Sequence, residues 1–290
     1  MSILDRLNGM TLEDAEKKVT SLDFNKMHKD SLIDLELVYE RPPIVISIGR
    51  DDKSYNGVNY PLRFGTAGNI SMIKGEEKAR KSFLKSLILG CSFGGNSNLY
   101  TNSLEILGHN LKDKWIIDAD TEQDDYDAWL NAIRIPKLVG VKPDNYLALK
   151  LRDKTPNERL QYFEWLFMES EYRKNLGVVS IDGYVDLIND FNSQLESSEL
   201  TQKLMKWSSL TKSHITGVLH LNPNSDKARG HLGTILQQKC ETVVIIADKG
   251  DYSLVTCQRG RGKKFREFCI TVNNEWLPEV IDNPDGENWM

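Results

Sequence analysis

The sequence lacks any cysteine pattern that would hold a zinc ion or a disulfide framework. Its four cysteines, Cys91, Cys240, Cys257 and Cys269, are scattered over 290 residues without a Cys-x-x-Cys pair. Zinc sites and small disulfide-rich domains need closely spaced cysteines. The cysteine usage therefore argues against both and favours a reducing compartment, which we expect to be the cytoplasm.

Long apolar runs and an excess of basic residues are missing as well. No window approaches the roughly 18 consecutive apolar residues that a membrane-spanning helix needs. The first residues, MSILDRLNGM, lack the basic-then-apolar pattern of a secretory signal. The formal net charge is −5, so any contact with nucleic acid must come from a local patch rather than a global positive field. We expect a soluble protein without a membrane partner.

The chain is predicted to divide near a pair of prolines. Residues 11–37 are polar and helix-prone, and Pro42 and Pro43 follow soon after them. Because proline disfavours helix at and before its position, a boundary lies near residue 41. We expect residues 1–40 to form an N-terminal helical arm and residues 41–290 to form one larger domain.

Within the larger domain, short apolar runs alternate with stretches of helical length. This alternation predicts an α/β fold with a mainly parallel sheet and helices on both of its faces. Two final runs, 252–257 and 267–272, flank a turn-like segment and predict a C-terminal antiparallel hairpin at the sheet edge. The expected strands of the sheet are 44–49, 70–75, 115–120, 146–151, 176–182, 215–221 and 242–248, and the expected helices are 78–90, 124–134, 156–170, 195–212 and 230–239.

Residues 69–89, NISMIKGEEKARKSFLKSLIL, have the outline of a phosphate-binding loop between a strand and a helix. The consensus loop is G-x-x-x-x-G-K-[ST], and Gly75, Lys81 and Ser82 match it. Such a loop offers backbone N–H groups to the phosphates of ATP, its lysine reaches the β and γ phosphates, and its serine ligates Mg²⁺. The predicted ATP-binding residues are Gly75, Glu76, Glu77, Lys78, Ala79, Arg80, Lys81, Ser82 and Phe83.

Two features of this loop favour the alternative of an ordinary solvated turn. Arg80 replaces the second glycine, and Glu76 and Glu77 bring negative charge close to the phosphates. Arg80 is compatible with binding if the backbone there does not need a positive φ, and the glutamates can point to water.

Carboxylates end two of the predicted strands. Asp182 closes LGVVSID and is a candidate Mg²⁺ ligand, although an aspartate there could also cap a helix. Glu122 follows WIIDAD and could act as the general base that deprotonates the attacking water. Asp118 and Asp120 compete for that role, and Asp120 could instead begin the next turn.

The segment ITGVLHLNPNSDKARG adds a histidine at a strand end and a polar loop. His220 is either a satisfied core histidine or a group that senses the γ-phosphate from the strand next to Asp182. The loop 222–230 carries Lys227 and Arg229, and it is either a solvated surface loop or a contact for a ligand.

Together these elements resemble the RecA-like P-loop ATPases, and among them the ring-forming helicases of the RepA and DnaB type. GEEKARKS resembles the Walker A loop, DTEQ the segment with the catalytic glutamate, and VVSID the Walker B strand. GVLHLNPNSDKARG is similar to a RepA motif, and VTCQRGRGKKFREFCITV to the DnaB hairpin with its Lys-Gln-Arg finger. The resemblance covers roughly residues 44–273 and implies that residues 41–290 form a RecA-like ATPase domain.

The resemblance also implies individual roles. Glu122 would be the catalytic base, Asp182 the Walker B acid and His220 the γ-phosphate sensor. Arg229 or Arg259 would be an arginine finger that acts on the nucleotide of a neighbouring subunit. Cys257 departs from the pattern because it occupies the position of the basic residue in the DnaB motif.

A site shared between subunits implies a homo-oligomer, and we expect a hexameric ring, with a filament as the alternative. In the family, the loop after the sensor strand tracks single-stranded DNA, so Lys227 and Arg229 would contact it here. The basic segment RGRGKKFR, residues 259–266, is either a solvated hairpin tip or a contact for DNA or a subunit. The expected function is an ATP-hydrolysing DNA motor of a plasmid, phage or mobile element. The alternatives are a RecA-like recombination ATPase and a KaiC-like regulatory ATPase that does not bind DNA.

Overall fold

The computed structural model describes residues 23–55, 57–93, 106–221, 228 and 230–284. The chain divides into two compact units, Met1–Arg41 and Pro42–Met290. The described part of the first unit contains one helix, α3 (Phe24–Ser31), which begins after Asp23, whose side chain accepts a hydrogen bond from the N–H of Lys26. Such an N-cap satisfies one of the unpaired N–H groups of the first helical turn.

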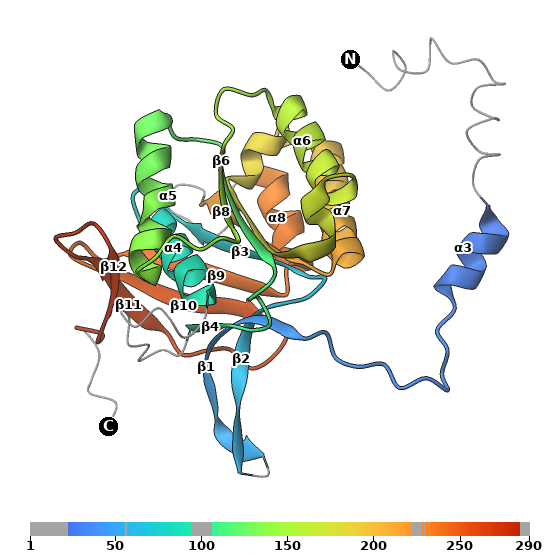
Figure 1. Cartoon of the computed structure of the whole chain (residues 1–290), viewed down its shortest axis with the longest axis horizontal. Helices are drawn as coiled ribbons and strands as arrows, with labels where there is room; N and C mark the ends of the chain where they lie inside the picture. The colour runs from blue at the N-terminus through green and yellow to red at the C-terminus, as the bar shows by residue number, and fades with distance from the viewer. Residues whose placement is uncertain (1–22, 56, 94–105, 222–227, 229, 285–290) are drawn as a thin grey trace. The chain divides into compact units, whose positions relative to one another are not determined.

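The second unit is built on a nine-stranded sheet (Figure 1). The strands follow the order β12-β11-β10-β9-β3-β8-β7-β5-β6 across this sheet, which is parallel from β9 to β6 and antiparallel from β9 to β12. The bounds are β3 (Ile70–Gly75), β5 (Trp115–Asp120), β6 (Tyr146–Lys150), β7 (Leu176–Asp182), β8 (His214–His220), β9 (Thr242–Asp248), β10 (Ser253–Gly260), β11 (Phe268–Val272) and β12 (Pro278–Ile281).

Helices cover both faces of this sheet. The α-helices are α4 (Lys81–Ser92), α5 (Asp125–Val139), α6 (Pro156–Met168), α7 (Gln194–Thr211) and α8 (Gly230–Lys239), and two short 3-10 helices, η1 (Glu171–Asn175) and η2 (Tyr184–Leu187), flank β7. One apolar core joins α4 and α5 to one face, and a second joins α6, α7 and α8 to the other. The predicted α/β fold, its mainly parallel sheet and its C-terminal antiparallel hairpin are confirmed, and β12 extends the hairpin.

The prediction for residues 44–49 is wrong in one respect. They begin β1 (Ile44–Tyr55), which lies in a separate three-stranded antiparallel sheet, β2-β1-β4, with β2 (Val58–Thr66) and β4 (Ile106–Gly108). Its buried apolar side chains pack in the same core as α4 and α5. The outer half of the β1–β2 hairpin is polar, which hid β2 from a search for apolar runs, whereas the Asn-Gly pair at 56–57 is a known hairpin signal.

The connections leave the sheet in opposite directions at its centre. β3 leads into α4 on one face, whereas the adjacent β8 precedes α8 on the other. Gly75, the last residue of β3, pairs in register with His220, the last residue of β8. In open α/β sheets, ligands bind outside the carboxyl ends of the strands at such a switch point. Within the described residues, no helix is both long and apolar enough to cross a membrane.

Candidate functional site

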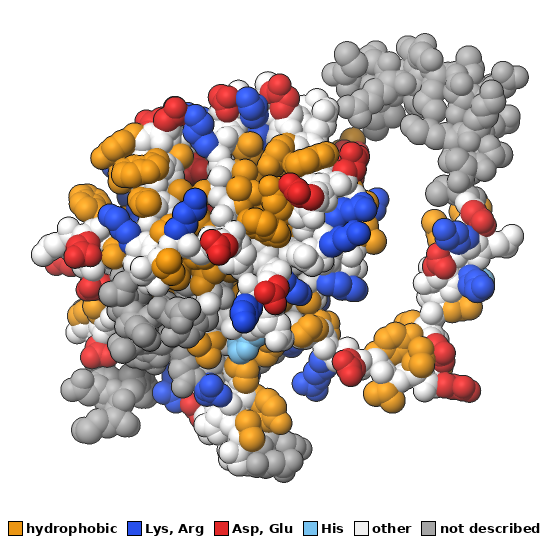
Figure 2. Space-filling model, viewed as in Figure 1, with side chains coloured by type: hydrophobic (Ala, Val, Ile, Leu, Met, Phe, Trp, Pro, Cys, Tyr) orange, Lys and Arg blue, Asp and Glu red, His pale blue; other side chains and the backbone are white. Residues whose placement is uncertain are grey.

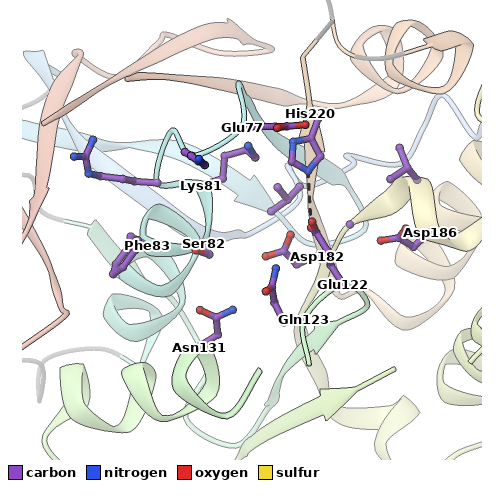
Figure 3. A pocket seen from close by; sticks show the side chains of 15 residues that line it. Glu77, Lys81, Ser82, Phe83, Glu122, Gln123, Asn131, Asp182, Asp186 and His220 are labelled. Carbon is purple, nitrogen blue, oxygen red and sulfur yellow. Dashed lines mark ion pairs between the residues drawn. The ribbon is translucent and has the colours of Figure 1, made fainter. Parts of the chain in front are cut away.

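A pocket of about 640 Å³ lies at this switch point, and the loop between β3 and α4 forms one of its walls (Figure 3). It brings together residues that sequence reasoning had singled out from four separate segments: Glu77, Lys78, Arg80, Lys81, Ser82, Phe83, Glu122, Asp182 and His220. It also contains residues that were not predicted: Gln123, Asn131, Gly183, Val185, Asp186 and Val218.

Three further loop residues shape this wall without lining the pocket. Gly75 packs directly against β9, since a Cβ there would lie 2.5 Å from the carbonyl oxygen of Ile246. Only glycine fits so close to a neighbouring backbone. Ala79 is buried, and the carbonyl of Glu76 accepts a hydrogen bond from the Lys81 ammonium.

The backbone of the loop curls in a way that favours anion binding. Lys78 and Arg80 both have a positive φ, 62° and 64°. Left-handed residues alternating with ordinary ones turn successive N–H groups toward a common point, which makes a concave anion site. Arg80 is the N-cap residue of α4 and makes no side-chain cap hydrogen bond there. The N–H of Phe83 bonds to the carbonyl of Arg80, so in the first turn of α4 the N–H groups of Lys81 and Ser82 are the ones left for a ligand.

Arg80 does not meet the condition under which it was expected to be tolerated, because its φ is positive. Its guanidinium instead lies against the turn between β9 and β10. Nη1 lies 2.8 Å from Oδ1 of Asp248, 3.0 Å from Oγ of Ser253 and 3.2 Å from the carbonyl of Tyr252, and Nη2 donates to the carbonyl of Gly250. These hydrogen bonds stabilise Arg80 at the position where the consensus loop has its second glycine.

This arrangement predicts a difference between two substitutions of Arg80. Both Arg80→Gly and Arg80→Ala remove the four contacts to the β9–β10 turn. Alanine still has the free-energy cost of a positive φ at residue 80, whereas glycine does not. We therefore expect Arg80→Ala to be less stable than Arg80→Gly by about 1 kcal/mol, as measured by urea unfolding. Equal stabilities of the two variants would show that the backbone at residue 80 is not strained.

Lys81 extends from the start of α4 toward the acidic side of the pocket. Its side chain is largely buried, and this burial lowers the pKa of its ammonium, while Asp182, Glu122 and Glu77 act in the opposite direction. The three carboxylates near Lys81 repel an anionic ligand. Such a ligand can bind beside Lys81 if it carries a cation of its own or offsets the negative charge of the carboxylates. A nucleotide that carries Mg²⁺ meets this requirement.

Glu122 and His220 face each other across the pocket (Figure 3), with 3.8 Å between Oε2 of Glu122 and Nε2 of His220. Interaction with His220 lowers the pKa of Glu122, so the carboxylate is ionised at neutral pH. Asp120 does not compete for the role of base, since its Oδ1 accepts the N–H groups of Glu122 and Gln123 and its Oδ2 accepts from Asn131. Asp120 instead begins the turn that carries Glu122, which was the second possibility that the sequence offered for it.

Lys85 is the main residue that sequence reasoning missed. It lies one helical turn after Lys81, is almost completely buried, and its Nζ is 3.0 Å from Oδ1 of Asp118 and 3.2 Å from Oδ2 of Asp182. The two carboxylates raise the pKa of Lys85, which outweighs the opposing effect of its burial. Asp118 is thereby engaged in a buried ion pair, and it is not among the residues that line the pocket. The signal was a lysine inside the apolar stretch SFLKSLIL.

Arg259, one of the two proposed arginine fingers, is not among the residues that line this pocket. Arg259 lies on β10 opposite Val243, near the amino end of β9, and its guanidinium donates to the carbonyl of Gln237 at 2.7 Å. The pocket lies at the other end of the parallel strands. Lys227 and Arg229 lie outside the described residues.

A scan against protein-family models finds no match to the chain, and a search of curated proteins finds none either. Among the described residues there is no group of three or more His, Cys, Asp or Glu side chains that could hold a metal ion by itself.

Proposed function

We propose that the protein is an ATP-hydrolysing, RecA-like motor that acts on single-stranded DNA, as a replicative helicase or translocase of the RepA and DnaB type. One observation carries this proposal. The loop after β3, with Lys81 and Ser82, shares a single pocket with Asp182, Glu122 and His220 from the carboxyl ends of β7, β5 and β8. The strand order supports the proposal as well. Strand β8 separates β3, which carries the loop, from β7 and β5. Asp182 and Glu122 therefore lie across the pocket from the loop.

The residues present fit a triphosphate with its metal ion. The curled loop and the uncapped start of α4 direct N–H groups toward the pocket, and Lys81 supplies a positive charge. Mg²⁺ is usually held by one or two protein groups together with phosphate oxygens, rather than by a complete protein cage. Ser82 and Asp182 are the groups that would hold it here, and the metal would neutralise charge that develops on the γ-phosphoryl group.

Each side chain then has a defined task. Lys81 and the loop bind and orient the triphosphate. Glu122, ionised at neutral pH, accepts the proton of the attacking water. His220, on β8 with β7 between it and β5, lies 3.8 Å from the Glu122 carboxylate and lies where it can respond to the γ-phosphate. Burial raises the pKa of Asp182, and Lys85, with its Nζ 3.2 Å from Oδ2, opposes that rise and favours the ionised carboxylate.

The remaining parts of the proposal come from the family resemblance. A finger from a neighbouring subunit, Arg229 or Arg259, would complete the site, and such a finger contributes about 10³ to 10⁵ in rate in related enzymes. The protein would therefore act as a hexameric ring, with Lys227 and Arg229 tracking the strand in its channel.

Measuring ATP hydrolysis with and without single-stranded DNA tests the proposal. We expect DNA to stimulate the rate and the stimulation to fade between low and moderate salt, because phosphate contacts release counterions. Lys81→Ala should abolish the heat of ATP-Mg²⁺ binding in calorimetry, since the loop loses its cation.

Lys206→Ala is the control for Lys81→Ala, since Lys206 is an exposed lysine on α7 that does not line the pocket. It should retain binding. No binding of ATP by the unmodified protein would overturn the proposal. A hydrolysis rate indifferent to DNA would favour the KaiC-like regulatory alternative, and stimulation without fork unwinding would favour the recombination alternative.

A further inference from the structure

A basic surface forms where two segments far apart in the sequence meet. One is the β1–β2 hairpin and the other is the stretch 259–267, which ends β10 and leads to β11. Lys263 forms an ion pair with Asp51, and Nη2 of Arg266 lies 2.9 Å from Oδ1 of Asp52. The contact is close, since a Cβ on Gly262 would lie 2.8 Å from Nε of Arg63.

This surface has the opposite charge to the chain as a whole. Residues 50–66 and 259–267 together contain eight Lys or Arg residues and three carboxylates, in a chain whose formal net charge is −5. Asp51 and Asp52 form ion pairs that hold the two segments together. These pairs neutralise only part of the positive charge. Lys53 and Lys264 are both exposed, and Lys264 makes one hydrogen bond, to the carbonyl of Gln258. Figure 2 shows basic side chains beside the hairpin that projects at the lower edge of the view.

The basic surface is separate from the nucleotide pocket. Gly260 pairs with Thr242, the first residue of β9, so the stretch 259–267 begins at the amino end of the parallel strands. Two of its arginines are fixed there, because Arg259 donates to the carbonyl of Gln237 and Arg261 lies 3.4 Å from that of Lys239. Both carbonyls belong to the last turn of α8, which accepts cations favourably. The backbone contacts hold both arginines at this edge of the sheet.

We propose that this surface binds the phosphate backbone of a nucleic-acid strand. Closely spaced lysines and arginines are the groups that bind successive phosphates, and arginine does so with paired hydrogen bonds. Gly260 and Gly262 lie between the cations and present no side chain that would keep a strand away. Tyr60 is exposed on β2, but the alternation of β2 directs it to the face opposite Arg63. The contact is therefore to phosphates and independent of base sequence.

The inference depends on the proposed function only for the choice of nucleic acid as the partner. It adds a strand contact that is distinct from the loop 222–230 and does not need nucleotide. It is tested by fluorescence anisotropy with a labelled 30-nucleotide oligothymidylate and the full chain, without ATP, over a range of salt concentrations. We expect the unmodified protein to bind at 50 mM salt, and Lys53→Glu/Lys264→Glu to bind at least tenfold more weakly. Losing two phosphate contacts should also lower the magnitude of the logarithmic salt slope by about 1.4.

The matched control is Lys174→Glu/Lys206→Glu, which makes the same charge change at exposed positions on η1 and α7. It should bind within about twofold of the unmodified protein. Lys53→Ala/Lys264→Ala gives a smaller loss in the same direction if the glutamates disturb the fold. The inference fails if the two Lys→Glu pairs bind equally, or if the protein binds phosphatidylserine vesicles but not the oligonucleotide. Lys81→Ala should bind the oligonucleotide normally, so a failed ATPase and a failed basic surface give different results.

Discussion

Replacing Glu122 with glutamine is expected to leave ATP binding intact and to lower the rate of ATP hydrolysis by about 10² to 10⁴. The amide keeps the shape of the side chain at the pocket wall but cannot accept a proton from water. Calorimetry should therefore give the same affinity for ATP-Mg²⁺ as the unmodified protein, and single-turnover measurements should show slow hydrolysis. Because interaction with His220 lowers the pKa of Glu122, we expect the unmodified protein to lose ATP hydrolysis through this group only as the pH falls below the ordinary glutamate value of 4.5.

The matched control is Glu77→Gln, which removes a second carboxylate from the same pocket. Glu77 lies in the phosphate loop rather than opposite it, so its loss should not lower the rate, and it should strengthen ATP binding by reducing repulsion of the phosphates. If Glu122→Gln hydrolyses ATP at the unmodified rate, the general base is another group.

The sequence predicted the main sheet because its strands have one clear signal. Buried parallel strands are apolar throughout, as β7 is, so runs such as LGVVSID stand out. The β1–β2 hairpin has no such signal over its outer half, because Val58, Asn59 and Tyr60 are exposed and burial in β2 begins only at Leu62. For that reason β2 was missed, and the apolar run 44–49, whose residues Val45, Ile46 and Ile48 are buried, was assigned to the main sheet instead.

The sequence predicted those residues of the candidate site whose positions are set by the ends of the parallel strands. Gly75, Asp182 and His220 are the last residues of their strands, and Glu122 follows Asp120 in the turn after β5, so the parallel arrangement places them at one edge. Contacts that depend on folding at a distance could not be read from spacing. Arg80 is separated by 168 residues from Asp248, its partner across the loop. No local pattern indicates that this arginine replaces a glycine by binding a distant turn.

The largest effect on stability is expected for Lys85→Met. Methionine fills a similar volume, but it leaves the carboxylates of Asp118 and Asp182 buried without their shared cation. Removing one member of a buried ionic cluster costs about 3–5 kcal/mol, so the free energy of unfolding in urea should fall by that amount. Lys150→Met, which removes the cation of the exposed pair with Asp125, should change it by no more than about 1 kcal/mol.

The pH dependence and a compensating variant separate this explanation from a simple packing defect. Burial raises the pKa of Asp182 above the ordinary value of 3.8, and Lys85 opposes that rise. Without Lys85 the pKa rises further, and a carboxyl with a raised pKa loses its contribution to stability as the pH increases through that pKa. The difference in stability between the unmodified protein and Lys85→Met should therefore be larger at pH 8 than at pH 5. Adding Asp118→Asn and Asp182→Asn to Lys85→Met should restore much of the loss, because no unpaired buried charge remains. A loss that is the same at both pH values and is not restored would instead indicate that Lys85 acts through the packing of its aliphatic chain.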